Sequence, residues 1–189
     1  MTGFTREQLG WTPWLEPPAA DELTDEHREA LVDRARAASP YFRLLARDPR
    51  ILHARTVTDN DIFHNADGGL PRAERELAAT ATSRRNGCVF CASVHARFAA
   101  HHSRRPGDVQ RLLDEGVHAR QDDRWRAIID ASAALTATPG ELTAGHLAAL
   151  RAAGLDDLEI SDVINAAAFF NWANRLMLSL GEPVKEEDR

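Results

Sequence analysis

Hydrophobic positions along the chain recur at helical spacing, and no convincing stretch alternates in the way that marks a strand. Leu31, Ala35 and Ala38 continue one such pattern, and Leu77 and Ala81 continue another. Alanine, leucine, arginine and glutamate are plentiful, whereas valine and isoleucine are sparse, and this balance favours helix over sheet. The pattern therefore predicts an all-α fold with little or no sheet.

Capping and breaking residues divide this pattern into separate helices. Thr24 is a typical N-cap residue, Pro49 suits the first position of a helix, and Asn86-Gly87 is a typical stop signal. Pro106 is expected to interrupt the chain before the next helix. The predicted helices cover about residues 24–38, 41–47, 49–64, 71–85, 88–102, 109–114, 122–136, 143–153 and 158–180.

The chain of 189 residues has the length of one ordinary domain. Residues 1–20 hold tryptophans and prolines that exclude a long helix, so we expect an N-terminal extension lying over its own domain or over a neighbouring subunit. Residues 21–182 are predicted to form a single helical domain. Residues 183–189 are predicted to be a polar tail that frays.

Composition excludes several classes of protein. The net charge of −6 and a pI of about 5.7 give no support to nucleic-acid binding. Mean hydropathy is −0.40, and no apolar run approaches the roughly 18 residues of a membrane helix. The start, MTGFTREQLG, lacks the basic and apolar regions of a secretory signal, so a cytoplasmic location is expected.

The residues best suited to catalysis are concentrated around the two cysteines. Cys88 and Cys91 are three positions apart, and His95 follows four positions later. Since each helical residue turns by about 100°, the three side chains fall within an arc of roughly 60° on one helix face. Glu76 lies on the preceding helix, where an inward-facing carboxylate could hold the imidazole and relay protons.

This arrangement favours a reactive dithiol. Gly87 places the cysteines in the first turn of a helix, where unpaired N–H groups and the helix dipole favour thiolate over thiol. A protonated His95, with Arg84 and Arg85 at the end of the preceding helix, would add positive charge. A thiolate beside a second thiol can attack a peroxide, become a sulfenic acid and condense to a disulfide.

The cysteine pair is compatible with other roles. A zinc site would need His64, His101 or His102 to complete it, because no second Cys-x-x-Cys exists. Covalent haem would need a histidine at position 92, which is alanine, and a thioredoxin-like motif would need a preceding strand. Two small cysteines in an ordinary core are a further possibility. No cofactor and no metal are therefore expected.

The pattern of Glu, eleven residues, Cys-x-x-Cys, three residues and His resembles the active site of the alkylhydroperoxidase D (AhpD)-like, peroxidase-related branch of the carboxymuconolactone decarboxylase superfamily. It is formed here by Glu76, Cys88, Cys91 and His95. The segments RELAATATSRRNGCVFCASVHARFAA and LRAAGLDDLEISDVINAAAFFNWANRLMLSLGEP are similar to that family, so the resemblance covers roughly residues 48–182. The N-terminal LGWTPWLEP also resembles an extension seen in some members.

The resemblance implies an AhpD-like bundle of about seven to nine helices and a cysteine-based peroxidase that cycles through a disulfide. It implies that Cys91 attacks the hydroperoxide and that Cys88 resolves the product. The implied partners are a hydroperoxide substrate, a thiol or lipoyl-type reductant, and further copies of the chain in a dimer, trimer or hexamer. Phe90 stands where the best-studied members carry a histidine.

Two alternative functions use the same dithiol: a redox-responsive accessory or binding protein, and a general disulfide oxidoreductase. Asn171, Asn174 and Arg175 interrupt an otherwise apolar helix face near the C-terminus. We expect these polar groups either to face the helix that carries the cysteines or to lie at a subunit interface.

Overall fold

In the computed structural model, residues 3–185 are described, and they form nine α-helices, one short 3-10 helix and two short strands. In chain order the elements are β1 (Leu9–Pro13), α1 (Asp25–Ala30), η1 (Arg34–Ala38), α2 (Pro40–Leu45), α3 (Pro49–His64), α4 (Arg72–Asn86), α5 (Val89–Ser103), α6 (Pro106–Glu115), α7 (Asp123–Thr136), α8 (Ala144–Ala152), α9 (Asp157–Leu180) and β2 (Gly181–Lys185).

The predicted all-α fold is confirmed, because sheet is confined to the one short strand pair within the described residues. The five long helices, α3, α4, α5, α7 and α9, begin and end within one residue of the predicted positions. Aspartate caps explain three of these starts, since Asp48, Asp122 and Asp156 each accept a backbone N–H of the first turn. Pro106 begins α6 instead of breaking the chain, as suits its fixed φ.

The single helix predicted over residues 24–38 is wrong. Helix α1 ends at Ala30, and a separate 3-10 helix starts at Arg34. Between them the side chain of Asp33 accepts the backbone N–H of Ala35, and Val32 adopts a positive φ of 62°. Short polar side chains compete with helical hydrogen bonds in this way, so Asp33 starts a new element where apolar spacing alone predicted continuity.

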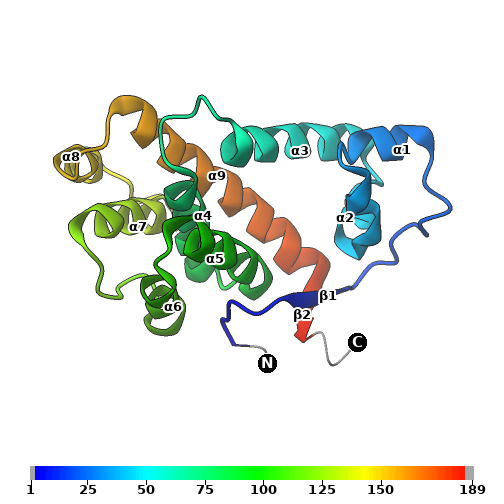
Figure 1. The fold of residues 1–189 in the computed structure, drawn as a ribbon. Coiled ribbons are helices and arrows are strands. Elements are labelled where there is room, and N and C mark those ends of the chain that lie inside the picture. The colour runs from blue at the N-terminus through cyan, green and yellow to red at the C-terminus, as the bar shows by residue number, and fades with distance from the viewer. Residues whose placement is uncertain (1–2, 186–189) are drawn as a thin grey trace.

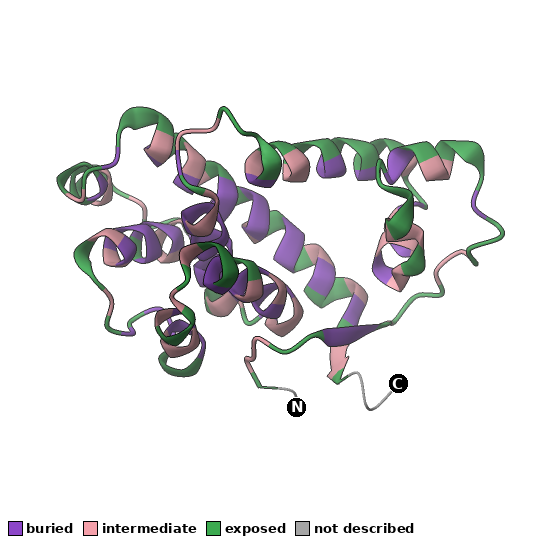
Figure 2. Ribbon diagram, viewed as in Figure 1, coloured by how far each residue is buried: buried purple, intermediate pink, exposed green. Residues whose placement is uncertain are grey.

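The main core surrounds α4 (Figure 1), which packs against α5, α7 and α9. The buried faces of these helices turn toward one another, while their outer faces are exposed (Figure 2). Leu77, Leu112, Ile128 and Val163 are among the fully buried side chains of this core. Ten consecutive residues of α4 are buried, from Glu74 to Ser83, which makes it the central helix of the fold.

A second, smaller core lies beneath the N-terminal helices. Leu23, Leu31 and Leu52 are buried there, where α1 packs against α3. Helix α3 in turn contacts both α4 and α9, so this part is joined to the main core. It places α2 and α3 beside the N-terminal end of α5, which carries the cysteines.

The strand pair β1–β2 was not predicted. Leu9 pairs with Lys185 and Pro13 with Gly181 in an antiparallel ladder at the end of α9 (Figure 1). Residues 183–185, expected to belong to a polar tail, are thus hydrogen-bonded to the N-terminal segment, and residues 186–189 lie outside the described part. Trp11 is buried and packs edge-on against Tyr41 of α2, so this segment lies over its own chain.

Candidate active site

A tight turn between α4 and α5 sets up the site. Gly87 ends α4 with a φ of 79°, a left-handed conformation that glycine adopts at low cost. The backbone N–H of Cys88 reaches back 2.9 Å to the carbonyl oxygen of Ser83. With so short a connection the two helices pack side by side, and residues of α4 face residues of α5.

Glu76 and His95 meet across this helix pair, as the sequence pattern predicted. The His95 Nδ1 lies 2.5 Å from Glu76 Oε2, and the second carboxylate oxygen accepts a 2.6 Å hydrogen bond from Arg72 Nε. Glu76 has no exposed surface, and His95 is 8% exposed. A buried carboxylate is costly without such partners, and Arg72 and His95 each bond to one of the Glu76 oxygens.

Two aromatic rings fix the orientation of the imidazole. The ring centroid of His95 lies 5.1 Å from that of Phe63 on α3 and 4.0 Å from that of Phe170 on α9, the latter in an edge contact. Since Nδ1 is bonded to Glu76, Nε2 is the nitrogen available to exchange a proton with a thiol or a substrate.

The two cysteines are reduced, and both are buried at the start of α5. The Cys91 thiol donates a hydrogen bond to Cys88, and this bond lowers the pKa of Cys88 against the opposing effect of burial; the backbone N–H of Cys91 also contributes. Donating the same bond, together with burial, raises the pKa of Cys91 well above the ordinary value. The pair therefore loses its first proton from Cys88.

That order differs from the simplest expectation from spacing, in which the sulfur closer to His95 carries the charge. Cys88 occupies the N-cap position of α5, and Cys91 lies one turn further in. The first sulfur therefore lies at the start of the helix, where the nearby backbone N–H of Cys91 helps to lower its pKa. Cys91 is nevertheless the more exposed residue, at 6% against 1% for Cys88.

Asn174 joins the site from α9. Its side chain is fully buried, donates to Ser83 Oγ at 3.1 Å and accepts from the Asn86 amide at 3.1 Å, both on α4. A further hydrogen bond from this amide lowers the pKa of both thiols, although it ranks behind the bond between the thiols and burial. Of the three polar residues flagged on α9, Asn174 thus faces the cysteines, while Arg175 is exposed and bonds to Asn171.

Some side chains of the site were not predicted, and two predicted contributors lie elsewhere. Tyr41 and Arg55 pack in or against the cluster around the thiols, but neither belongs to a sequence motif that would have identified it. The guanidinium of Arg84 instead stacks on Phe4 at 4.1 Å and donates to Leu113, and Arg85 lines a separate cavity. Neither arginine is among the main causes of the pKa shifts of the cysteines.

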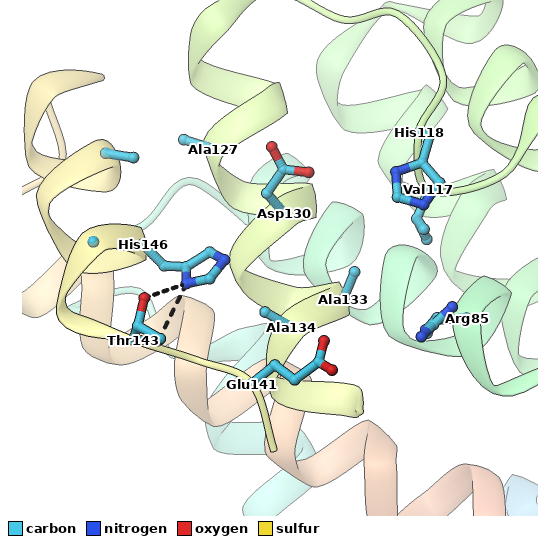
Figure 3. Close-up of a pocket in the computed structure, with 12 residues that line it drawn as sticks. Arg85, Val117, His118, Ala127, Asp130, Ala133, Ala134, Glu141, Thr143 and His146 are labelled. Carbon is cyan, nitrogen blue, oxygen red and sulfur yellow. Dashed lines mark hydrogen bonds between the residues drawn. The ribbon is translucent and has the colours of Figure 1, made fainter. Parts of the chain in front are cut away.

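That separate cavity, of about 520 Å³, is formed largely by α7 and α8 (Figure 3). Its polar side chains include His118, Asp130, Glu141 and His146, but none of the four predicted site residues lines it. His146 is bonded to Thr143 as part of a helix cap. This cavity is therefore separate from the buried thiols.

Within residues 3–185 no three His, Cys, Asp or Glu side chains are grouped so that they could hold a metal ion. Over the same residues no helix is both long and apolar enough to cross a membrane.

Comparisons with known proteins agree with the fold. Residues 49–134 match the carboxymuconolactone decarboxylase family. Among curated proteins no relative matches the sequence. An uncharacterised peroxidase-related protein from Ralstonia eutropha JMP134, described as an AhpD core, superposes with a TM-score of 0.77 at 24% identity over 93% of each chain.

Two further solved structures share the fold. A peroxidase-related protein from Silicibacter sp. TM1040 has a TM-score of 0.75 at 27% identity, covering 90% of this chain and 91% of its own. The debrominase Bmp8 has a TM-score of 0.64 at 16% identity, covering 86% and 83%. At that identity the likeness to Bmp8 shows the fold alone. The segment that matches the carboxymuconolactone decarboxylase family contains Glu76, both cysteines and His95, and the chain as a whole has an AhpD-like fold.

Proposed function

We propose that this protein is a thiol-dependent peroxidase that reduces hydroperoxides through a Cys88–Cys91 dithiol–disulfide cycle. The observation that carries the proposal is the hydrogen-bonded dithiol on the same helix as an imidazole whose other side is held by a buried carboxylate. The dithiol supplies two electrons, and the Glu76–His95 pair supplies a route for protons. Antioxidant defence of the cytoplasm, where a reductant can restore the thiols, is the setting we propose.

The reaction begins with one proton lost from the thiol pair to His95. Cys88 holds the negative charge first, and transfer of the shared proton from Cys91 to Cys88 places the thiolate on Cys91. Cys91 then attacks the terminal peroxide oxygen: an S–O bond forms, the O–O bond breaks, and an alkoxide leaves. The alkoxide takes the proton from His95 and departs as an alcohol.

Cys88 resolves the oxidised sulfur. Its thiol attacks the Cys91 sulfenic acid, a disulfide forms, and the hydroxyl leaves with the thiol proton as water. A disulfide needs Cα atoms about 4.4–6.8 Å apart, which residues three apart at the start of a helix satisfy. An external thiol or lipoyl-type dithiol then reduces the disulfide and completes the cycle.

Steady-state consumption of cumene hydroperoxide with a dithiol donor tests the proposal. The wild type should turn over, Cys91→Ser should be inactive, and Cys88→Ser should complete a single turnover. Dimedone followed by mass spectrometry should label Cys91 in the Cys88→Ser variant. Labelling of Cys88 in Cys91→Ser would reverse the two roles, and a wild type with two free thiols after stoichiometric peroxide would reject the peroxidase.

The same assay separates the two alternatives. A redox-responsive accessory protein would form its disulfide with peroxide but show no sustained turnover. A general disulfide oxidoreductase would exchange with small disulfides much faster than with hydroperoxides. The buried thiols favour a small oxidant over a protein disulfide, because both sulfurs lie beneath surrounding side chains.

A further inference from the structure

Three buried polar side chains in the thiol region have a hydrogen-bonding atom without a partner. They are the Tyr41 hydroxyl on α2, Arg55 Nε on α3 and Trp11 Nε1 on β1. All three residues are more than nine-tenths buried. An unpaired buried polar atom costs about 1–3 kcal/mol, so three of them near one site call for an explanation.

The orphaned atoms share a chemical character. The indole and guanidinium nitrogens can only donate a hydrogen bond, and the phenolic hydroxyl carries a donor proton as well. What is missing is therefore an acceptor, and an oxygen bearing negative charge would satisfy such donors best. Asp59 already pairs with the other end of the guanidinium, at Arg55 Nη1 (3.2 Å), which leaves Nε unused.

Packing places these donors against the cysteines. Tyr41, Trp11, Cys88 and Cys91 belong to one buried cluster, and the rings of Trp11 and Tyr41 meet edge-on at 5.3 Å. The guanidinium of Arg55 lies over the ring of Phe169 in the same cluster, at 5.4 Å. The donors thus come from three elements, β1, α2 and α3, that meet at the cluster holding both cysteines.

Electrostatics agree with this placement. Burial raises the pKa of Tyr41, the charge of Arg55 and a close contact between the two side chains lower it, and the neighbouring thiolates raise it. The contact with Arg55 does not meet hydrogen-bond geometry, so the hydroxyl is left without a partner. Arg55 also lowers the pKa of Cys91, behind the larger effects of its bond to Cys88 and of burial. Tyr41 therefore stays protonated at neutral pH and can donate a hydrogen bond without giving up its proton.

We propose that the Tyr41 hydroxyl and the Arg55 guanidinium form an oxyanion site beside the dithiol, which binds the leaving oxygen of an alkyl hydroperoxide. This inference rests on the proposed peroxidase function and adds two substrate-contacting residues to it. Trp11 packs against Tyr41 and fixes the position of its ring.

The site acts as the O–O bond breaks. The thiolate donates an electron pair to the terminal oxygen, the sulfur is oxidised to a sulfenic acid, and the departing oxygen is reduced to an alkoxide. Tyr41 and Arg55 stabilise the negative charge on that alkoxide by hydrogen bonds and charge until it receives the proton held by His95. Both donors are already oriented and desolvated, which is the condition under which such stabilisation is strongest.

Tyr41→Phe tests the inference, because it removes one oxygen and keeps the ring that packs against Trp11. The rate of thiol oxidation should be measured by stopped flow with tert-butyl hydroperoxide and with peracetic acid. The first releases a strongly basic alkoxide, and the second releases acetate, which needs little stabilisation. We expect a loss of about 10²-fold with tert-butyl hydroperoxide, typical of one lost oxyanion donor, and a change of about twofold or less with peracetic acid.

Thr56→Val is the matched control. It also removes a buried hydroxyl that lacks a partner, from α3, and should leave both rates unchanged. The rate of alkylation by iodoacetamide should be the same in the wild type and in Tyr41→Phe, which shows that the thiols retain their reactivity.

Equal losses with both peroxides would overturn the oxyanion site, because they would indicate a structural effect of the substitution. Unchanged rates with both would overturn it as well. In either case, a wild type that still reacts with both peroxides would leave the proposed peroxidase function supported. A wild type that reacts with neither peroxide rejects the proposed function, and the oxyanion site with it.

Discussion

At the scale of single residues, the site depends on a carboxylate that has lost all contact with water. Arg72 and His95 each bond to one of the Glu76 oxygens. Removing one partner of such a buried group is costly, because the other is left uncompensated. The carboxylate in turn holds the His95 imidazole in one orientation through Nδ1, which leaves Nε2 available for proton exchange.

Glu76→Gln should therefore slow peroxide reduction by about 10²–10⁴-fold, the usual range for a lost acid–base group. Glu74→Gln is the control, because Glu74 is also a buried carboxylate of α4. It forms a bidentate ion pair with Arg124, away from the thiols. Stopped-flow oxidation kinetics and thermal melts of both variants would distinguish the two roles. Equal rate losses in the two variants would mean that the effect is on folding and not on proton transfer.

The hydrogen bond between the sulfurs gives a prediction about pH. Because that bond lowers the pKa of Cys88, one thiol should react with iodoacetamide at pH values below the ordinary thiol pKa, and the second only above it. Cys91→Ala removes the donor, so the pKa of Cys88 should rise and its alkylation should shift to higher pH. Cys91→Ser keeps a donating hydroxyl and should shift less. Identical pH profiles for the two variants would contradict the proposed bond.

How much of the site could be predicted depends on where its residues lie in the sequence. Glu76 and His95 were found because one short turn fixes how two neighbouring helices align. Tyr41 and Arg55 belong to other helices and reach the thiols only through tertiary packing. No spacing rule connects them to the cysteines. Asn174 was flagged only because a polar residue in an apolar helix requires a partner.

At the scale of elements, helices could be predicted well because their signals are local. Caps, prolines and apolar spacing are all read within a few residues. The strand pair β1–β2 joins residues more than 160 positions apart, as in the pairing of Leu9 with Lys185. Neither strand alternates clearly between polar and apolar residues, so nothing local signals the pairing.

The strand pair also supports the site, since β1 carries Trp11, and this gives a prediction about Gly181. A Cβ at that position would lie 2.3 Å from the Thr12 carbonyl oxygen and 2.4 Å from the Trp11 ring. Gly181→Ala should therefore destabilise the fold by about 1–3 kcal/mol, as overpacking does. Thermal or urea unfolding measures this loss.

Gly107→Ala is the control for the previous variant. A Cβ there meets no atom within 4 Å, and the residue lies inside helix α6. Alanine favours helix over glycine by up to about 1 kcal/mol, so this variant should be as stable as the wild type or more so. An unchanged melting temperature for Gly181→Ala would show that the strand pair contributes little to stability.

At the scale of the whole molecule, the fold brings distant segments to one place. The thiol cluster draws on β1, α2, α3, α4, α5 and α9, and the two ends of the described chain pair beside it. An active site made from so many elements depends on the fold as a unit.

The surface of the same fold is relevant to the homo-oligomer that the sequence predicts. Two of the exposed apolar residues, Ile51 and Trp172, lie at one groove. Leu44, Leu45, Ile51, Leu52, Trp172 and Leu176 line a depression of about 320 Å³ that α2, α3 and α9 form. Ile51 is 56% exposed and Trp172 is 40% exposed. Large apolar side chains gathered in this way are typical of protein–protein contacts, and tryptophan is enriched at their centres. We expect a second copy of the chain to cover this groove.

Sedimentation at micromolar concentration should therefore give a mass that is a multiple of 20.9 kDa. Trp172→Glu should shift the protein toward a single chain, because a buried unpaired charge at the interface is costly. Leu158→Glu changes an even more exposed apolar residue near the start of α9 and should leave the assembly intact. A wild type that sediments as one chain would contradict the predicted oligomer. A groove-centred interface should tolerate a charge at Leu158. Equal dissociation by both variants would therefore contradict an interface confined to the groove and would indicate a contact along the whole of α9.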